Sequence, residues 1–137
     1  MKDLKLADRL FSLLVRTWAG WCCEHCQKDF GSRKHELECS HFWPRRHKGT
    51  RYDRENCDSL CHECHQWFHT ATGRWEYERW KKKLLGEERF EALAWRARAI
   101  TKLTEKRLAE MITDFKYQLS LTKWAALPVE RGEGLPF

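Results

Sequence analysis

The chain is short and basic: its 137 residues carry 26 lysine and arginine side chains against 20 acidic ones, a formal net charge of +6. This length allows a single domain with a modest core, and no stretch approaches the roughly 20 consecutive apolar residues of a membrane-spanning helix. Basic charge on a small domain favours a polyanionic partner, with nucleic acid the first candidate, although the same charge can serve solubility alone.

The first twenty residues predict an amphipathic helix rather than a secretory signal, because charged side chains interrupt the apolar ones. Asp3 is the expected N-cap and Gly20 the expected stop of an N-terminal helix over residues 1–20. We therefore expect a protein that works inside a cell and is not inserted in a membrane. The apolar residues that recur at helical spacing are Leu4, Ala7, Leu10, Phe11, Leu14 and Trp18.

Seven cysteines include two C-x-x-C pairs, Cys23 with Cys26 and Cys61 with Cys64, which are separated by 34 residues. In an intracellular protein this pattern favours metal binding over disulfides. Four thiolates close a tetrahedral shell around Zn²⁺ and leave no position for a substrate, so we expect a structural zinc. Ordinary buried cysteines are the alternative interpretation of the pairs. Cys22 is an open alternative to Cys23, and His25 and His62 are open alternatives as ligands.

Between the two pairs, short strands are expected near residues 36–40 and 57–60. The stretch 42–54 contains proline and glycine and is expected to be a loop. Cys39 and Cys57 fit neither zinc pair, and we interpret them as small buried residues beside the strands. A helix that carries the later histidines is expected to follow the second strand.

Residues 74–124 are helical in character and form an expected helical extension. Gly86 separates a helix over 75–85 from one over 87–100, and Thr104 can cap a third helix. Each of these boundaries rests on a residue type that commonly starts or stops a helix.

The third helix of this extension carries an apolar stripe, which either the domain itself or a second subunit must cover. Trp75, Trp80 and Trp95 are expected to pack inside the extension. Residues 125–137 hold two glycines and two prolines and are expected to form a flexible tail. The stripe consists of Leu108, Met111, Ile112, Phe115 and Leu119.

Three histidines and one asparagine in the middle of the chain follow a specific spacing. His41 precedes Asn56 by 15 residues, Asn56 precedes His65 by nine, and His65 precedes His69 by four. On a helix the last two lie one turn apart on one face, where they can hold a metal ion. This order and spacing resemble the HNH (His-Me finger, ββα-metal) endonucleases.

Further motifs resemble one particular group of these nucleases. The tripeptide Cys39-Ser40-His41, a basic loop, an Arg-x-Asn motif and the second cysteine pair are similar to the NinG/Rap recombination endonucleases of lambdoid phages, over about residues 22–120. The resemblance implies an α+β, mostly helical fold in which residues 21–73 form a zinc-stapled ββα-metal core. It also implies a metal-dependent endonuclease that cuts branched DNA, such as Holliday junctions, or nicks duplexes. If a phage encodes the protein, the expected location is the cytoplasm of a bacterial host.

The resemblance assigns chemical roles. His41 is expected to take a proton from the attacking water, since imidazole is mostly neutral at physiological pH, and Asn56 to hold the loop or the His41 backbone. His65, together with His69, is expected to bind a catalytic Mg²⁺ or Mn²⁺. Ser40 stands where these nucleases usually carry an Asp or His ligand. A hydroxyl is a weaker ligand, and a shell made mainly of histidines favours Mn²⁺, Ni²⁺ or Zn²⁺ over Mg²⁺.

A basic loop follows the expected base, with five basic residues against one acid in ten positions. Phosphate contacts from such a loop position a DNA strand without reading its sequence, and a merely solvated loop is the alternative. Symmetric cleavage of a junction would need a homodimer. A non-catalytic zinc module that binds nucleic acid is the alternative function. The expected DNA-binding residues are Arg45, Arg46, Lys48, Arg51 and Arg54.

Overall fold

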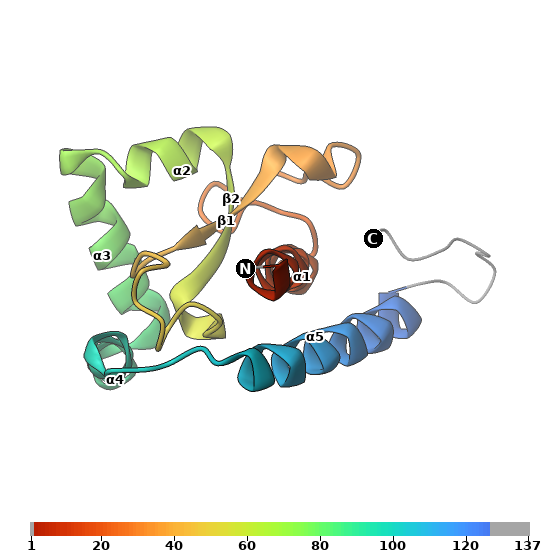
Figure 1. Ribbon diagram of the computed structural model, residues 1–137. Helices are drawn as coiled ribbons and strands as arrows, with labels where there is room; N and C mark the ends of the chain where they lie inside the picture. The colour runs from red at the N-terminus through yellow and green to blue at the C-terminus, as the bar shows by residue number, and fades with distance from the viewer. Residues whose placement is uncertain (1, 127–137) are drawn as a thin grey trace.

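The molecule is α+β and mostly helical, with two antiparallel strands at its centre and helices around them (Figure 1). The computed structural model describes residues 2–126, and this part of the chain contains five α-helices, one two-stranded sheet and two short 3-10 turns. Among the described helices, none is long and apolar enough to cross a membrane. The elements are α1 (Lys2–Trp18), a turn (Lys34–Glu36), β1 (Leu37–His41), a turn (Arg54–Asn56), β2 (Cys57–Cys61), α2 (His62–Phe68), α3 (Ala71–Leu85), α4 (Glu87–Arg98) and α5 (Glu105–Ala126).

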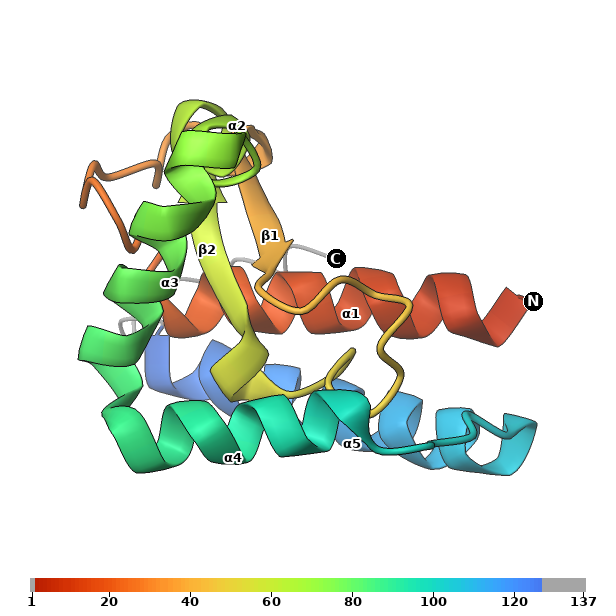
Figure 2. The ribbon, with the colours of Figure 1, turned by 90° about the vertical axis from the view of Figure 1, so that its left-hand side faces the viewer.

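Helix α1 lies between the sheet and α5, as the two views of Figures 1 and 2 show. Its apolar face packs on α5, where Phe11 meets Phe115 with ring centroids 5.3 Å apart. The apolar stripe of α5 is therefore covered inside the chain and is not available to a second subunit, which removes the dimer contact considered from the sequence. This first core is built mainly from Ala7, Leu10, Phe11, Leu14, Leu108, Ile112, Phe115 and Leu119, with Cys57 of β2 at its edge.

A second core lies under α2 and α3. The rings of Phe68 and Tyr77 stack at 4.3 Å with an interplanar angle of 8°, and the ring of Phe42, just after β1, meets Tyr77 edge-on. Every residue of β2 is buried, because the sheet has α1 on one side and this second core on the other. The two cores together fix the position of the strands.

The strand register decides which side chains share a face. His41 pairs with Cys57, and Cys39 pairs with Ser59. Because side chains alternate along a strand, Cys39 and His41 face α1, where both line one cavity. Ser40 points to the other face and contacts the second core. The candidate base is thus presented on the α1 side of β1.

The helix boundaries follow capping residues. The Thr70 hydroxyl accepts a hydrogen bond from the Gly73 amide at 2.9 Å, so α3 begins four residues earlier than the sequence predicted. Gly86 adopts a φ of +81°, which favours glycine, and separates α3 from α4 as expected. Thr104 caps α5 as expected, since its hydroxyl accepts from the Arg107 amide at 3.1 Å.

Several local predictions differ from the structure. Asp3 lies inside the first turn of α1 and is not its N-cap. Trp75 and Trp95 are 71% and 74% exposed, because no described element covers that face of α3 or α4, whereas Trp80 packs against the second core as expected. Of the expected tail at 125–137, the first two residues end α5 and the others lie outside the described part of the chain.

Candidate functional site

The four cysteines of the two C-x-x-C pairs come together. The first pair lies in the knuckle after α1, and the second joins the end of β2 to the first turn of α2. Their sulfur atoms all lie within 4.8 Å of one another, and those of Cys26 and Cys61 are 3.9 Å apart. A tetrahedral Zn–S bond of about 2.3 Å places sulfurs roughly 3.8 Å apart. The tetrad Cys23, Cys26, Cys61 and Cys64 therefore fits a metal ion such as zinc.

The first knuckle is shaped to hold a thiolate. The Cys26 amide points at the Cys23 sulfur at 3.5 Å, and Gln27 adopts a φ of +64° that tightens the turn. Burial acts to raise the pKa of Cys23, but hydrogen bonds from backbone amides outweigh it and lower that pKa. Cys22 is not part of the tetrad, and its thiol faces the Gly20 carbonyl at 3.6 Å. Of the two alternatives, the geometry selects Cys23.

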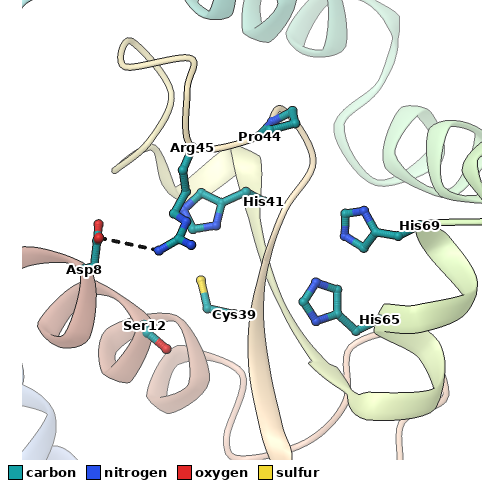
Figure 3. Close-up of a pocket in the computed structure, with 8 residues that line it drawn as sticks. All are labelled: Asp8, Ser12, Cys39, His41, Pro44, Arg45, His65 and His69. Carbon is teal, nitrogen blue, oxygen red and sulfur yellow. Dashed lines mark ion pairs between the residues drawn. The ribbon is translucent and has the colours of Figure 1, made fainter. Parts of the chain in front are cut away.

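A separate cavity of about 410 Å³ is lined by all three motif histidines, with His41 on one side of β1 and His65 and His69 on the other (Figure 3). Helix α1 forms one wall, the end of β1 and the following loop form another, and α2 supplies the last. This cavity is the candidate catalytic site. Its lining residues are Asp8, Ser12, Cys39, His41, Pro44, Arg45, His65 and His69.

The ring of His41 is oriented by the backbone of the basic loop. Its Nε2 atom lies 3.0 Å from the carbonyl oxygen of Arg51. A carbonyl only accepts hydrogen bonds, so Nε2 carries the proton and Nδ1 keeps a free lone pair when the ring is neutral. Burial lowers the pKa of His41 below its ordinary value of 6.5 and favours that neutral ring near pH 7. This is the state that a general base requires.

Asp8 of α1 holds the loop that supplies this carbonyl. Its two carboxylate oxygens accept hydrogen bonds from Arg51, from Nε at 2.9 Å and from a terminal nitrogen at 2.6 Å, and Tyr52 donates to it at 2.8 Å. Such a two-point contact fixes direction as well as distance. Sequence reasoning missed Asp8, because one acid on an amphipathic helix gives no signal of a partner 43 positions away.

Asn56 is fully buried and ties the two ends of the loop together. Its amide nitrogen donates to the carbonyls of Trp43 at 2.9 Å and Thr50 at 3.0 Å. Its amide oxygen accepts from the Trp43 N–H at 2.8 Å, and its own carbonyl accepts from Phe42. Asn56 lies outside the cavity and shapes the backbone that carries His41. This is the kind of contact that the sequence analysis expected of Asn56.

Glu38 orients His65 of α2. One carboxylate oxygen lies 2.7 Å from Nδ1 of His65, and the other lies 3.2 Å from Nδ1 of His62. A proton on Nδ1 of His65 leaves Nε2 free for a metal ion, an arrangement typical of metal-binding histidines. The sequence analysis did not predict the role of Glu38 either, because its partner His65 is 27 residues away.

His69 stands beside His65, with ring centroids 4.8 Å apart. It caps the C-terminus of α2 instead of lying within it, and burial lowers its pKa. Within residues 2–126, the two histidines do not belong to any preformed group of three metal ligands. An ion bound by this pair would therefore complete its shell with water or substrate oxygens.

Ser40 takes no part in this cavity. Its side chain is fully buried and its hydroxyl lies 2.9 Å from that of Tyr77. Tyr77 donates to Asp58 at 2.7 Å, which also pairs with Lys81 at 2.8 Å. Strand alternation turns residue 40 away whenever His41 faces the cavity. The position of Ser40 therefore does not support the metal-ligand role expected from the sequence.

The five basic residues assigned to DNA separate into two groups. Arg45, Arg46 and Lys48 are exposed on the loop, and Arg45 also lines the cavity, where it pairs with Asp8 at 3.6 Å (Figure 3). The side chain of Arg51 is 14% exposed and held by Asp8, so it serves the fold of the loop. Arg54 is also exposed, but its guanidinium stacks on Trp18 at 4.1 Å and the residue lines other cavities.

Comparison of the chain with protein-family models, with curated proteins and with solved structures found no match. No relative therefore assigns a class of protein or an activity to it.

Proposed function

We propose that this chain is an HNH (His-Me finger) endonuclease that hydrolyses phosphodiester bonds in DNA with the help of a divalent ion. The observation that carries the proposal is the oriented ring of His41 in a cavity shared with His65 and His69. His41 ends β1, His65 lies in α2 and His69 follows α2 directly, and two antiparallel strands followed by a helix are the order expected for a ββα-metal core. Zinc in the cysteine tetrad would fasten the chain before β1 to the junction of β2 and α2.

His41 acts as the general base in this proposal. With Nε2 held by the Arg51 carbonyl, Nδ1 accepts the proton of the attacking water, and the lowered pKa keeps the ring ready to do so. Asp8 and Asn56 hold the loop from two sides. Both therefore act on the reaction only through the position of the base.

His65 and His69 would hold the catalytic ion, with Glu38 orienting His65. When bound, a divalent ion supplies positive charge to the phosphate oxygens on which negative charge develops. Two imidazoles without a carboxylate suit Mn²⁺ better than Mg²⁺. We therefore propose a nuclease that works better with Mn²⁺ than with Mg²⁺.

The exposed cations of the loop are the proposed contact to the DNA backbone. Arg45, Arg46 and Lys48 project from the loop that follows His41, and contacts of this kind fix a strand without reading its bases. The resemblance to the NinG/Rap enzymes extends the proposal to branched DNA or nicked duplexes in recombination. Symmetric cleavage of a junction would need a dimer formed through a surface other than the buried stripe of α5.

A non-catalytic zinc module that binds nucleic acid is the second candidate. The inward-facing hydroxyl of Ser40 favours it, because the proposed ion then has two protein ligands in place of three. The two candidates share the tetrad and the basic loop. They differ in whether His65 and His69 hold an ion that assists phosphodiester hydrolysis.

Cleavage of a supercoiled plasmid and of a synthetic four-way junction separates the candidates. Zinc-loaded protein is assayed without added ion, with Mg²⁺ and with Mn²⁺, beside His65→Ala and beside His35→Ala, an exposed histidine outside the cavity. The nuclease proposal expects ion-dependent cutting that His65→Ala loses and His35→Ala keeps. Binding of both DNAs without cutting under every ion would replace it with the second candidate.

A further inference from the structure

Three potential metal ligands outside the tetrad meet on the α1 side of the sheet. One donor atom each from Cys39, His41 and Cys57 lies within 4.8 Å of the other two, which is the same spacing that the zinc tetrad meets. The strand register creates the group: His41 and Cys57 are directly paired, and Cys39 lies two residues before His41 on the same face of β1. The sequence reading took both cysteines for packing residues.

The chemistry of this group suits a thiophilic ion. Two thiols and one imidazole are the protein ligands of open zinc sites, in which water or substrate takes the fourth position. Both cysteines are free thiols, and the Cys57 thiol lies 4.0 Å from the Arg51 carbonyl oxygen, a long and weak contact. Mg²⁺ and Mn²⁺ bind thiolates weakly and would compete poorly here.

An ion can reach the group from the catalytic cavity. Cys39 and His41 line that cavity, and Figure 3 shows the Cys39 sulfur directed toward the His41 ring. Cys57 closes the back of the group, since it is only 5% exposed. The carboxylate of Asp8, on the opposite wall, is occupied by Arg51 and Tyr52, which leaves the fourth position to water.

We propose that Cys39, His41 and Cys57 form a second site for Zn²⁺ or a similar thiophilic ion, and that its occupation switches off the base. The switching part rests on the nuclease function proposed above. If the ion takes Nδ1 of His41, it takes the lone pair that would accept the proton. If it takes Nε2, it breaks the hydrogen bond to Arg51 that orients the ring. Either geometry gives an inactive zinc-bound state that a chelator reverses.

Binding is tested without any assay of activity. Protein with zinc in its tetrad is titrated with Co²⁺ under a phosphine reductant, and the sulfur-to-cobalt absorption band is recorded while released zinc is measured. We expect one equivalent of Co²⁺ to give the band without zinc release. Cys39→Ser and Cys39→Ala should lose the band, whereas Cys22→Ser, at a cysteine outside both groups, should keep it. No band in the wild type, or the same band in Cys39→Ser, would overturn the site.

Cys39 is chosen for substitution because it is only half-buried, while Cys57 lies in the core. Circular dichroism and retained tetrad zinc establish that each variant is folded. A variant that has lost its tetrad zinc is replaced by the other Cys39 variant, so that the comparison is always made between folded proteins.

Inhibition is tested separately, on cleavage supported by Mn²⁺. Each protein is compared with its own rate before zinc is added, and Cys39→Ser should need at least about tenfold more Zn²⁺ for half inhibition. Equal sensitivity of wild type and Cys39→Ser would overturn the switch. Absence of cleavage in every protein would instead refute the nuclease function, and the cobalt titration would still decide whether the site exists.

Discussion

The imidazole of His41 donates from Nε2 to the main-chain carbonyl of Arg51, 3.0 Å away. This contact selects the tautomer whose Nδ1 can accept a proton. The carbonyl is in turn immobilised, because the Arg51 side chain is anchored on Asp8 of α1. A helix outside the two-strand unit thus takes part in presenting the candidate base.

The Asp8–Arg51 contact gives the first prediction. Asp8→Asn should lower the free energy of unfolding by about 1–3 kcal/mol, because it removes the charge from a mostly buried acceptor of three hydrogen bonds. Asp3→Asn, in the first turn of the same helix, is the matched control and should cost less. Urea unfolding of the three zinc-loaded proteins measures the difference. An effect of Asp8→Asn no larger than that of the control would contradict this account of α1.

The same carboxylate gives a pH dependence. Burial acts to raise the pKa of Asp8, but hydrogen bonds from Arg51 and Tyr52 outweigh it and lower that pKa below its ordinary value of 3.8. A lowered pKa stabilises the folded state above the unfolded value of about 3.9, and this stabilisation is lost as pH falls through the folded value. The stability difference between wild type and Asp8→Asn should therefore be constant near neutral pH and shrink below about pH 4. A difference that grows on acidification would be inconsistent with the shift.

The buried pair behind the sheet should be important for stability. Lys81 and Asp58 are 2% and 5% exposed at their side chains, so Lys81→Met leaves a buried carboxylate without its counter-charge. We expect a loss of about 3–5 kcal/mol in the free energy of unfolding, against little change for the exposed neighbour Lys82→Met. Adding Asp58→Asn to Lys81→Met should recover part of the loss, because it removes the stranded charge. A double variant as unstable as the sum of both singles would argue against direct coupling.

Removal of the metal should unfold the region around the tetrad. The knuckle after α1 is joined to β2 and α2 by the four thiols, and ligand sites of this kind contribute their binding energy to folding. A strong zinc chelator, or Cys26→Ser, should reduce helical circular dichroism and lower the melting temperature, while Cys22→Ser should keep both zinc and fold. Full retention of structure in zinc-free protein would show that the tetrad is not structural.

Glu38 should control the affinity for the catalytic ion. Glu38→Gln weakens the hydrogen bond that orients His65, and loss of such a partner typically costs 10–100-fold in metal affinity. The concentration of Mn²⁺ at half-maximal cleavage should rise by about that factor, with little change for Glu36→Gln on the nearby turn. If Glu38→Gln lowers the maximal rate without changing the Mn²⁺ requirement, Glu38 does not act through the ion.

The sequence predicted those parts of the site that local spacing determines. Two C-x-x-C pairs indicate a four-thiol centre, and Gly86 and Thr104 mark helix boundaries, because each signal is contained within a few residues. The apolar stripe of α5 was also evident, but the helix that covers it could be found only from the fold.

The contacts that could not be predicted join distant segments. Asp8 and Glu38 act on partners 43 and 27 residues away, and nothing in their own neighbourhoods indicates those partners. Once it is known which face of β1 carries His41, strand alternation directs Ser40 to the opposite, inner face. The packing of α3 determines these faces, because its Tyr77 contacts the Ser40 hydroxyl. The approach of Cys57 to Cys39 likewise depends on the register of β1 and β2.

The most direct test of the central claim is the single-turnover rate of DNA cleavage by His41→Ala with Mn²⁺, beside wild type and His35→Ala. Each protein is first shown to retain its zinc and to bind the DNA. A general base usually contributes about 10²–10⁴-fold, so we expect a fall of that size in the cleavage rate of His41→Ala alone. Cleavage at the wild-type rate by folded, zinc-loaded His41→Ala would contradict it.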